Sequence, residues 1–384
     1  MQIPIRNVWL LQLYASSFCR SAGTGLVSME DNPEDLPELA ARILADEVAV
    51  RLHTGLSVGF RQTTRAVNRV RGRINILTTE RHQLLRRGLV NCTFDEIVTD
   101  TPANRLAKAA LEKAAVLVPK EPRYRSLALQ LGAAGVRGPC PPLNSVSAMQ
   151  RQRLLTRDQL MVAAAELLLT LAIPTTESGG KMLPLPSLED TYLRKLFERA
   201  VYGFYRHRLT PSGWNVSHGD HLKWDISAAS PGMPAILPRM ELDVVLKHAN
   251  SPEGGQRRIV IDTKFTAVTK PGQHGKPTLA SGYLYQIYAY LMSQDAREPD
   301  IKSEGLMLHP TVAEHLDEEV VIQGHRIRFA TVDLLATPHQ IADGLLSAVA
   351  PMSHQPSRWP TIPAGSFSGV AQVRRRARTR LPPQ

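Results

Sequence analysis

The stretch RRIVIDTKFTAV, residues 257–268, decides the fold expected for this chain. Its β-branched run at residues 259–261 predicts a buried strand, because such side chains pack well on a pleated surface. The strand continues into Asp262 and Lys264, which share one face because strand side chains alternate with a period of two. A buried carboxylate is costly unless it is paired or binds a metal ion. The end of this strand therefore calls for a chemical explanation.

A second apolar run, ILPRMELDVVLKH (236–248), precedes this strand, and the loop SPEGGQ (251–256) separates the two. This arrangement predicts a β-hairpin with Asp243 on its first strand. Two carboxylates across a hairpin fit Mg²⁺, which prefers oxygen ligands, and a metal-bound water near an ammonium group is a good nucleophile toward phosphate. The pattern predicts a magnesium-dependent phosphodiesterase centre. The alternative is a structural Asp262–Lys264 ion pair, which the D-x-K spacing alone favours.

Two helices are predicted around this hairpin. Residues 189–209 carry one apolar stripe at helical spacing, and Glu198 lies at its edge, where a side chain can turn toward a core-side pocket. Residues 281–293 place Gln286 and Tyr290 at i and i+4 on one face. Taken alone, this Gln/Tyr pair is typical of a helix surface.

The order of these residues resembles a nuclease pattern. Asp243 followed by Asp262-Thr263-Lys264 is similar to the core of the PD-(D/E)xK superfamily, and Gln286 with Tyr290 resembles the Q-x3-Y element of its RecB-like members. The run GLMLHP (305–310) predicts a following strand. The expected fold class is α/β (α+β), with a central mixed sheet flanked by helices.

The N-terminal half is expected to be a mixed α/β region. Helices are predicted over 31–55 and 100–118, the second capped by Thr101 or Asp100. Residues 61–87 carry eight arginines and a single acid, with β character interrupted by a glycine. These arginines form either a solvated charged face or a contact surface for nucleic acid or an acidic partner protein.

Composition is that of a soluble globular protein with a basic excess. Lys and Arg total 46 and Asp and Glu total 35, so the formal net charge is 46 − 35 = +11. This excess suits a polyanion such as DNA, although solubility alone also explains it. Cys19, Cys92 and Cys140 form no CxxC pair, which fits a reducing cytoplasm. The most apolar segment, 160–174, is too short to span a bilayer, so no membrane association is expected.

Three regions are expected along the chain. Residues 1–180 form the N-terminal region, residues 181–352 the nuclease domain, and residues 353–384 a disordered basic tail. The boundary is placed at SGGKMLPLPS (178–187), whose glycines and prolines are typical of a linker.

An ordered set of segments makes the chain resemble the McrC family, the nuclease subunits of McrBC modification-dependent (type IV) restriction systems. The segments are IPIRNVWLLQLYA (3–15), VRGRIN (70–75), FDEIVTDTPANRLAKAAL (94–111), LKWD (222–225), LPRMELD (237–243), IVIDTKF (259–265) and LYQIYAYL (284–291).

The resemblance implies roles for particular residues. Asp243 and Asp262 would be the metal ligands and Lys264 the catalytic lysine, with Gln286 and Tyr290 supporting the site. Glu198 would be either the additional acid that many superfamily members carry on a helix or a plain helix-edge glutamate.

The resemblance also implies a partner. The N-terminal region would engage and stimulate a hexameric McrB-like AAA+ GTPase, and residues 61–87 gain a third candidate role as part of that contact. GTP would bind the partner, since this chain has no G-x-x-x-x-G-K-[ST] loop. Recognition of modified cytosine in double-stranded DNA would also belong to the partner.

The expected function is a magnesium-dependent DNA endonuclease subunit driven by that GTPase. One alternative is a non-catalytic adaptor that activates the GTPase and only grips DNA. A weaker one is a stand-alone RecB-like repair nuclease, against which the large N-terminal region argues.

Overall fold

The N-terminal part of the protein is a helical core. The computed structural model describes residues 2–18, 33–143, 156–171, 182–184, 190–222, 224, 226, 228–238, 240–251, 255–271, 277–295, 301, 303–311 and 315–351. Its early elements are β1 (Gln2–Pro4), α1 (Ile5–Ala15), η2 (Pro33–Asp35), α4 (Leu36–Thr54), α6 (Pro102–Leu117), α7 (Pro122–Ala133), η4 (Thr156–Asp158) and α9 (Gln159–Leu171). Buried aliphatic residues of these helices form one hydrophobic cluster. The two predicted N-terminal helices are confirmed, and Thr101 caps α6 by accepting a hydrogen bond from the Asn104 N–H.

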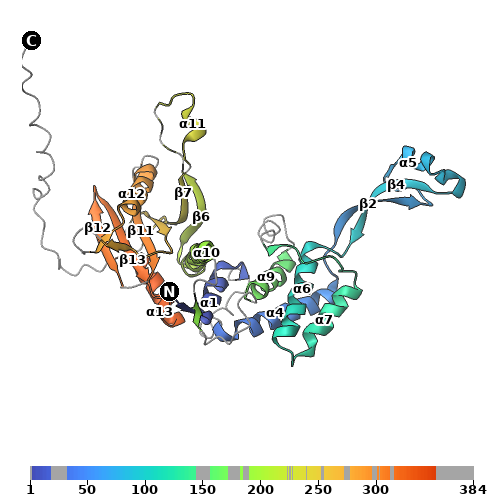
Figure 1. The fold of residues 1–384 in the computed structure, drawn as a ribbon, viewed down its shortest axis with the longest axis horizontal. Coiled ribbons are helices and arrows are strands. Elements are labelled where there is room, and N and C mark those ends of the chain that lie inside the picture. The colour runs from blue at the N-terminus through green and yellow to red at the C-terminus, as the bar shows by residue number, and fades with distance from the viewer. Residues whose placement is uncertain are drawn as a thin grey trace, which may run out of the picture. The chain divides into compact units, whose positions relative to one another are not determined.

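A separate three-stranded sheet interrupts this helical core between α4 and α6 (Figure 1). It has the order β2-β4-β3, from β2 (Gly59–Val67), β3 (Arg73–Ile74) and β4 (Val90–Val98), with α5 (Ile76–Arg81) and η3 (Leu84–Arg87) between the last two. Gly72 has φ +60°, and a Cβ there would lie 2.5 Å from the Thr93 carbonyl oxygen. Glycine is required at this turn, which confirms the predicted interruption of the strand.

The C-terminal part is built on a six-stranded mixed sheet in the order β12-β13-β11-β8-β7-β6 (Figure 1). The strands are β6 (Trp214–Leu222), β7 (Met240–His248), β8 (Arg257–Thr263), β11 (Ser303–Pro310), β12 (Asp317–Ile322) and β13 (His325–Val332). β7 runs antiparallel to both β6 and β8, whereas β11 runs parallel to both β8 and β13. The predicted hairpin, following strand and mixed sheet are therefore confirmed.

Helices cover both faces of this sheet because its central strands are apolar on both sides. α10 (Asp190–Leu209) and α13 (Pro338–Val349) share a core with one set of strand residues, which includes Ile259 and Ile261. α12 (Ser281–Asp295) shares a second core with Val260 and Met307. Successive residues of β8 thus enter different cores, as the period of two requires.

Smaller elements complete the described fold. η6 (Thr210–Ser212) follows α10, α11 (Met233–Ile236) lies between β6 and β7, and β9 (Thr269–Pro271) pairs with β10 (Pro277–Leu279). β5 (Met182–Pro184) pairs antiparallel with β1, so the segment interpreted as a linker contains a strand. The rest of that segment, and the whole of the expected tail at residues 353–384, lie outside the described residues. The domain boundaries remain predictions.

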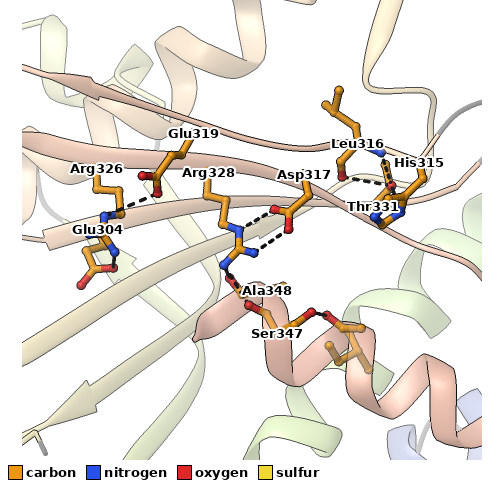
Figure 2. Close-up of polar contacts among 12 residues, drawn as sticks. Glu304, His315, Leu316, Asp317, Glu319, Arg326, Arg328, Thr331, Ser347 and Ala348 are labelled. Carbon is orange, nitrogen blue, oxygen red and sulfur yellow. Dashed lines mark hydrogen bonds and ion pairs between the residues drawn. The ribbon is translucent and has the colours of Figure 1, made fainter. Parts of the chain in front are cut away.

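Arg328 of β13 ties the edge strand to α13 (Figure 2). Its guanidinium donates to both carboxylate oxygens of Asp317 on β12, at 2.6 and 2.7 Å, and to the carbonyl oxygens of Ser347 and Ala348, at 2.8 and 3.1 Å. A cation at these last carbonyls offsets the negative end of the helix dipole. β12, β13 and α13 were not predicted from the sequence.

No helix in the described part of the chain is long and apolar enough to cross a membrane.

Candidate active site

The two predicted metal ligands lie at the same end of the β7–β8 ladder. The last pair of that ladder is Val244 with Ile261, and Asp243 and Asp262 are the residues immediately beyond it. On the other side of β7, the ladder with β6 omits Gly219, which has φ +69° and would be level with Asp243. The pairs on either side, His218 with Val244 and Asp220 with Leu242, keep the same register, so the ladder is interrupted at Gly219 without a bulge.

Thr263 fixes the Asp243 carboxylate. Asp243 Oδ2 accepts hydrogen bonds from the Thr263 backbone N–H at 2.7 Å and from its hydroxyl at 2.8 Å. Burial raises the pKa of Asp243, and the negative charge of Glu198 adds to this, while the two bonds from Thr263 lower it. Thr263 thereby fixes the orientation of one carboxylate oxygen of Asp243, in a buried environment that disfavours the ionised form of this group.

Asp262 is almost fully buried beside Lys264. The side chain of Asp262 is 2% exposed, and its Oδ2 lies 2.8 Å from Lys264 Nζ. Burial raises the pKa of Asp262 to about 6, the nearby Lys264 lowers it, and the charges of Asp243 and Glu198 raise it. The contact expected of the ion-pair alternative is present. It does not exclude a catalytic role, because the same contact places an ammonium group at a carboxylate that is expensive to ionise.

Glu198 of α10 is engaged by a residue that the sequence analysis missed. Its Oε1 lies 3.0 Å from Nε2 of His218 on β6, and this hydrogen bond is the main reason why the pKa of Glu198 is lowered. The His218 ring also lies against Tyr202, with 5.0 Å between ring centroids. The sequence signal for His218 was weak, because nothing local pairs residues 198 and 218.

Gln286 and Tyr290 lie on α12, close to the acids. Gln286 Nε2 donates to Tyr290 Oη at 2.8 Å, and Tyr290 is buried. Burial raises the pKa of Tyr290, and the charges of Asp262 and Asp243 contribute to that rise. An isolated Gln/Tyr motif predicts that both residues lie on the helix surface, and for Tyr290 this prediction is wrong.

The donor set at this site fits a hard divalent cation held by two protein carboxylates. Asp243 and Asp262 are adjacent acids whose pKa values are raised by burial, so a cation between them would relieve an electrostatic cost. Mg²⁺ commonly binds through one or two carboxylates and keeps several waters. Within the described residues, no three His, Cys, Asp or Glu side chains are arranged to hold a metal ion together. Among those residues, Glu198 is thus not arranged with Asp243 and Asp262 as a third ligand, and its role at the metal stays a prediction.

Comparison with known proteins settles the family. The family model for the McrBC 5-methylcytosine restriction system component matches residues 8–301. The chain belongs to this family. The match spans every residue proposed for the site and ends before β11, so β11, β13 and α13 lie outside it. The resemblance seen in the sequence is thus confirmed.

Individual relatives are distant. The type IV methyl-directed restriction enzyme EcoKMcrBC of Escherichia coli strain K12 is 24% identical over 340 residues, covering 86% of this chain and 93% of that protein. A half-complex from a tetradecameric assembly of Thermococcus gammatolerans McrB AAA+ hexamers with bound McrC is 16% identical, with a TM-score of 0.35, over 81% of this chain and 67% of that chain. The Thermococcus gammatolerans McrBC complex is 19% identical, with a TM-score of 0.28, over 44% and 46%.

Proposed function

We propose that this restriction-system component is a magnesium-dependent DNA endonuclease of the PD-(D/E)xK type. The observation that carries the proposal is the junction of β7 and β8, where two neighbouring carboxylates, each with a raised pKa, meet a lysine ammonium 2.8 Å from one of them. Membership of a 5-methylcytosine restriction family supports DNA as the substrate.

In this proposal, each residue of the site has a separate role in hydrolysis. Asp243 and Asp262 would hold Mg²⁺, which when bound polarises the scissile phosphate and acidifies a water. Thr263 keeps one oxygen of Asp243 in a fixed orientation. Lys264 lies next to the buried Asp262 and would orient the attacking water or stabilise the negative charge that develops on the phosphate.

We further propose that the three-stranded sheet β2-β4-β3 contacts a McrB-like AAA+ GTPase, which binds GTP, selects modified cytosine and is stimulated by this chain. The cross-strand pair Phe60 and Ile97 is 76% and 65% exposed, and Leu77 on α5 is 84% exposed. Exposed large apolar side chains on elements that also carry many arginines are typical of an interaction surface. This pattern favours the protein contact over the plain solvated face that residues 61–87 alone suggest.

The test of the nuclease is cleavage of methylated plasmid by the chain with its GTPase partner, GTP and Mg²⁺. Asp262→Asn is expected to abolish cleavage while partner assembly and GTP hydrolysis persist, because the substitution removes a ligand charge without changing side-chain volume. EDTA should abolish cleavage by the wild type. Full cleavage by Asp262→Asn would refute the proposal and favour the non-catalytic adaptor.

The test of the partner contact is Leu77→Asp, with Val321→Asp as a matched control on edge strand β12. Both residues are exposed, so folding should be unaffected. Leu77→Asp should weaken assembly with the GTPase about ten-fold, since anchors of this kind contribute about 1–2 kcal/mol to an interface. Equal behaviour of the two variants would contradict the proposed contact.

A further inference from the structure

An aromatic residue outside the nuclease pattern lies against the predicted catalytic lysine. Lys264 Nζ lies 5.8 Å from the centroid of the Tyr283 ring. The same nitrogen lies 2.8 Å from Asp262 Oδ2. A lysine ammonium within about 6 Å of an aromatic face is attracted by the electron density of that face. The ammonium group is therefore held by two partners of different chemistry.

Tyr283 is itself fixed by its surroundings. Its hydroxyl lies 3.0 Å from the Thr266 hydroxyl, and its ring lies 5.5 Å from the His309 ring, tilted by 55°. Tyr283 lies in the first turn of α12, three residues before Gln286 and on the same side of the helix. The ring that faces Lys264 is thus part of the helix that also carries the Gln/Tyr pair.

His309 supports this ring without adding charge. It is fully buried on β11, and its Nδ1 lies 2.8 Å from the Thr266 carbonyl oxygen. Because a carbonyl only accepts hydrogen bonds, Nδ1 carries the proton in this contact. Burial, aided by the positive charge of Lys264, lowers the pKa of His309, which favours the neutral ring. In the described part of the chain, His309 Nε2 has no hydrogen-bond partner.

We propose that Tyr283, backed by His309, is a positioning residue for Lys264, whose ammonium group it holds against the Asp262 carboxylate. The proposal rests on the nuclease function proposed above. A lysine side chain is long and flexible, so an ammonium that is already held in place when substrate arrives needs less reorganisation in the transition state. The contact should therefore act on the cleavage step and not on DNA binding.

The experiment uses the full chain assembled with its GTPase partner, GTP, Mg²⁺ and methylated DNA. Tyr283→Leu removes the aromatic face and is expected to lower kcat about ten-fold, or about 1.4 kcal/mol, with KM for DNA and the GTPase rate unchanged. Tyr283→Phe keeps the face and loses only the hydroxyl contact, so it should restore most of that loss. Tyr285→Leu, at an exposed position of the same helix, is the matched control and should cleave as the wild type does.

Ring fluorination at position 283 separates positioning from packing. Each added fluorine on a phenylalanine there weakens the negative face with little change in size, so log kcat should fall stepwise with the number of fluorines. This series also decides the matter if Tyr283→Leu fails to fold. Equal rates across the fluorinated series, or a rise in KM in place of a fall in kcat, would overturn the proposal.

Lys264→Ala separates a failure of the nuclease proposal from a failure of the positioning role of Tyr283. It should abolish cleavage, and adding Tyr283→Leu to it should change nothing further. If Lys264→Ala still cleaves, the nuclease assignment fails. If Lys264→Ala is inactive while the Tyr283 variants cleave normally, only the positioning role is wrong.

Discussion

Replacing Gly203 by alanine tests the contact between α1 and α10, the helix that carries Glu198. A Cβ at Gly203 would lie 1.8 Å from the Tyr14 carbonyl oxygen and 2.8 Å from its carbonyl carbon. Since a Cβ essentially never approaches a heavy atom closer than 3.0 Å, the helices must separate locally by about 3.0 − 1.8 = 1.2 Å. The obstructing atoms belong to the backbone of a buried helix and have no rotamer by which to move away.

Two opposing contributions determine how much Gly203→Ala changes the free energy of unfolding. Alanine is favoured over glycine inside a helix by about 1 kcal/mol. Overpacking costs about 1–3 kcal/mol or more, and a backbone obstruction belongs at or above the upper end. The free energy of unfolding should therefore fall by about 2 kcal/mol, lowering Tm by about 4 °C.

The assay is thermal and urea denaturation of the wild type, Gly203→Ala and Gly282→Ala. Gly282 lies in the first turn of α12, and nothing is within 4 Å of a Cβ built there, so its alanine variant should be neutral or slightly more stable. A Gly203→Ala protein as stable as the wild type would refute the close packing of α1 against α10.

Three further predictions follow from other contacts. Arg105 donates to both oxygens of Asp100 at 2.8 Å and lowers the pKa of Asp100, so its carboxylate stabilises the fold above the unfolded pKa of about 3.9 and loses that effect as pH falls. Urea denaturation from pH 5 to pH 3 should show a steeper loss of stability in the wild type than in Asp100→Asn, and parallel curves would contradict this. Thr263→Val removes one hydrogen bond to Asp243 and should raise the Mg²⁺ concentration for half-maximal cleavage about ten-fold in a magnesium titration; an unchanged requirement would count against a metal at Asp243. Arg328→Lys keeps the charge but not the forked geometry of the guanidinium group, so the free energy of unfolding should fall by about 2 kcal/mol. Amide hydrogen exchange in α13 should become faster. Unchanged exchange would show that this network does not anchor the helix.

Local patterns accounted for much of the fold. The alternation in 257–268, the stripe in 189–209 and the cap at Thr101 each depend on neighbours a few residues apart, and the structure confirms the corresponding hairpin, helix and cap. The family was also readable, because several short segments occur in a fixed order. β12, β13 and α13 were not predicted, although β13 pairs with β11 and places Arg328 under the last turn of α13.

By itself, the sequence determined that two acids and a lysine end neighbouring strands, because period-two alternation and a short loop leave little freedom in where those side chains go. Only the tertiary structure decided what surrounds them. It brings His218 into contact with Glu198 and lets Thr263 donate hydrogen bonds to Asp243. It also places the Tyr283 ring, which packs on His309, next to Lys264. These contacts join α10 to β6, β8 to β7, and α12 to β11 and to the residue that follows β8. No periodicity encodes them, since they depend on how the helices and strands pack together.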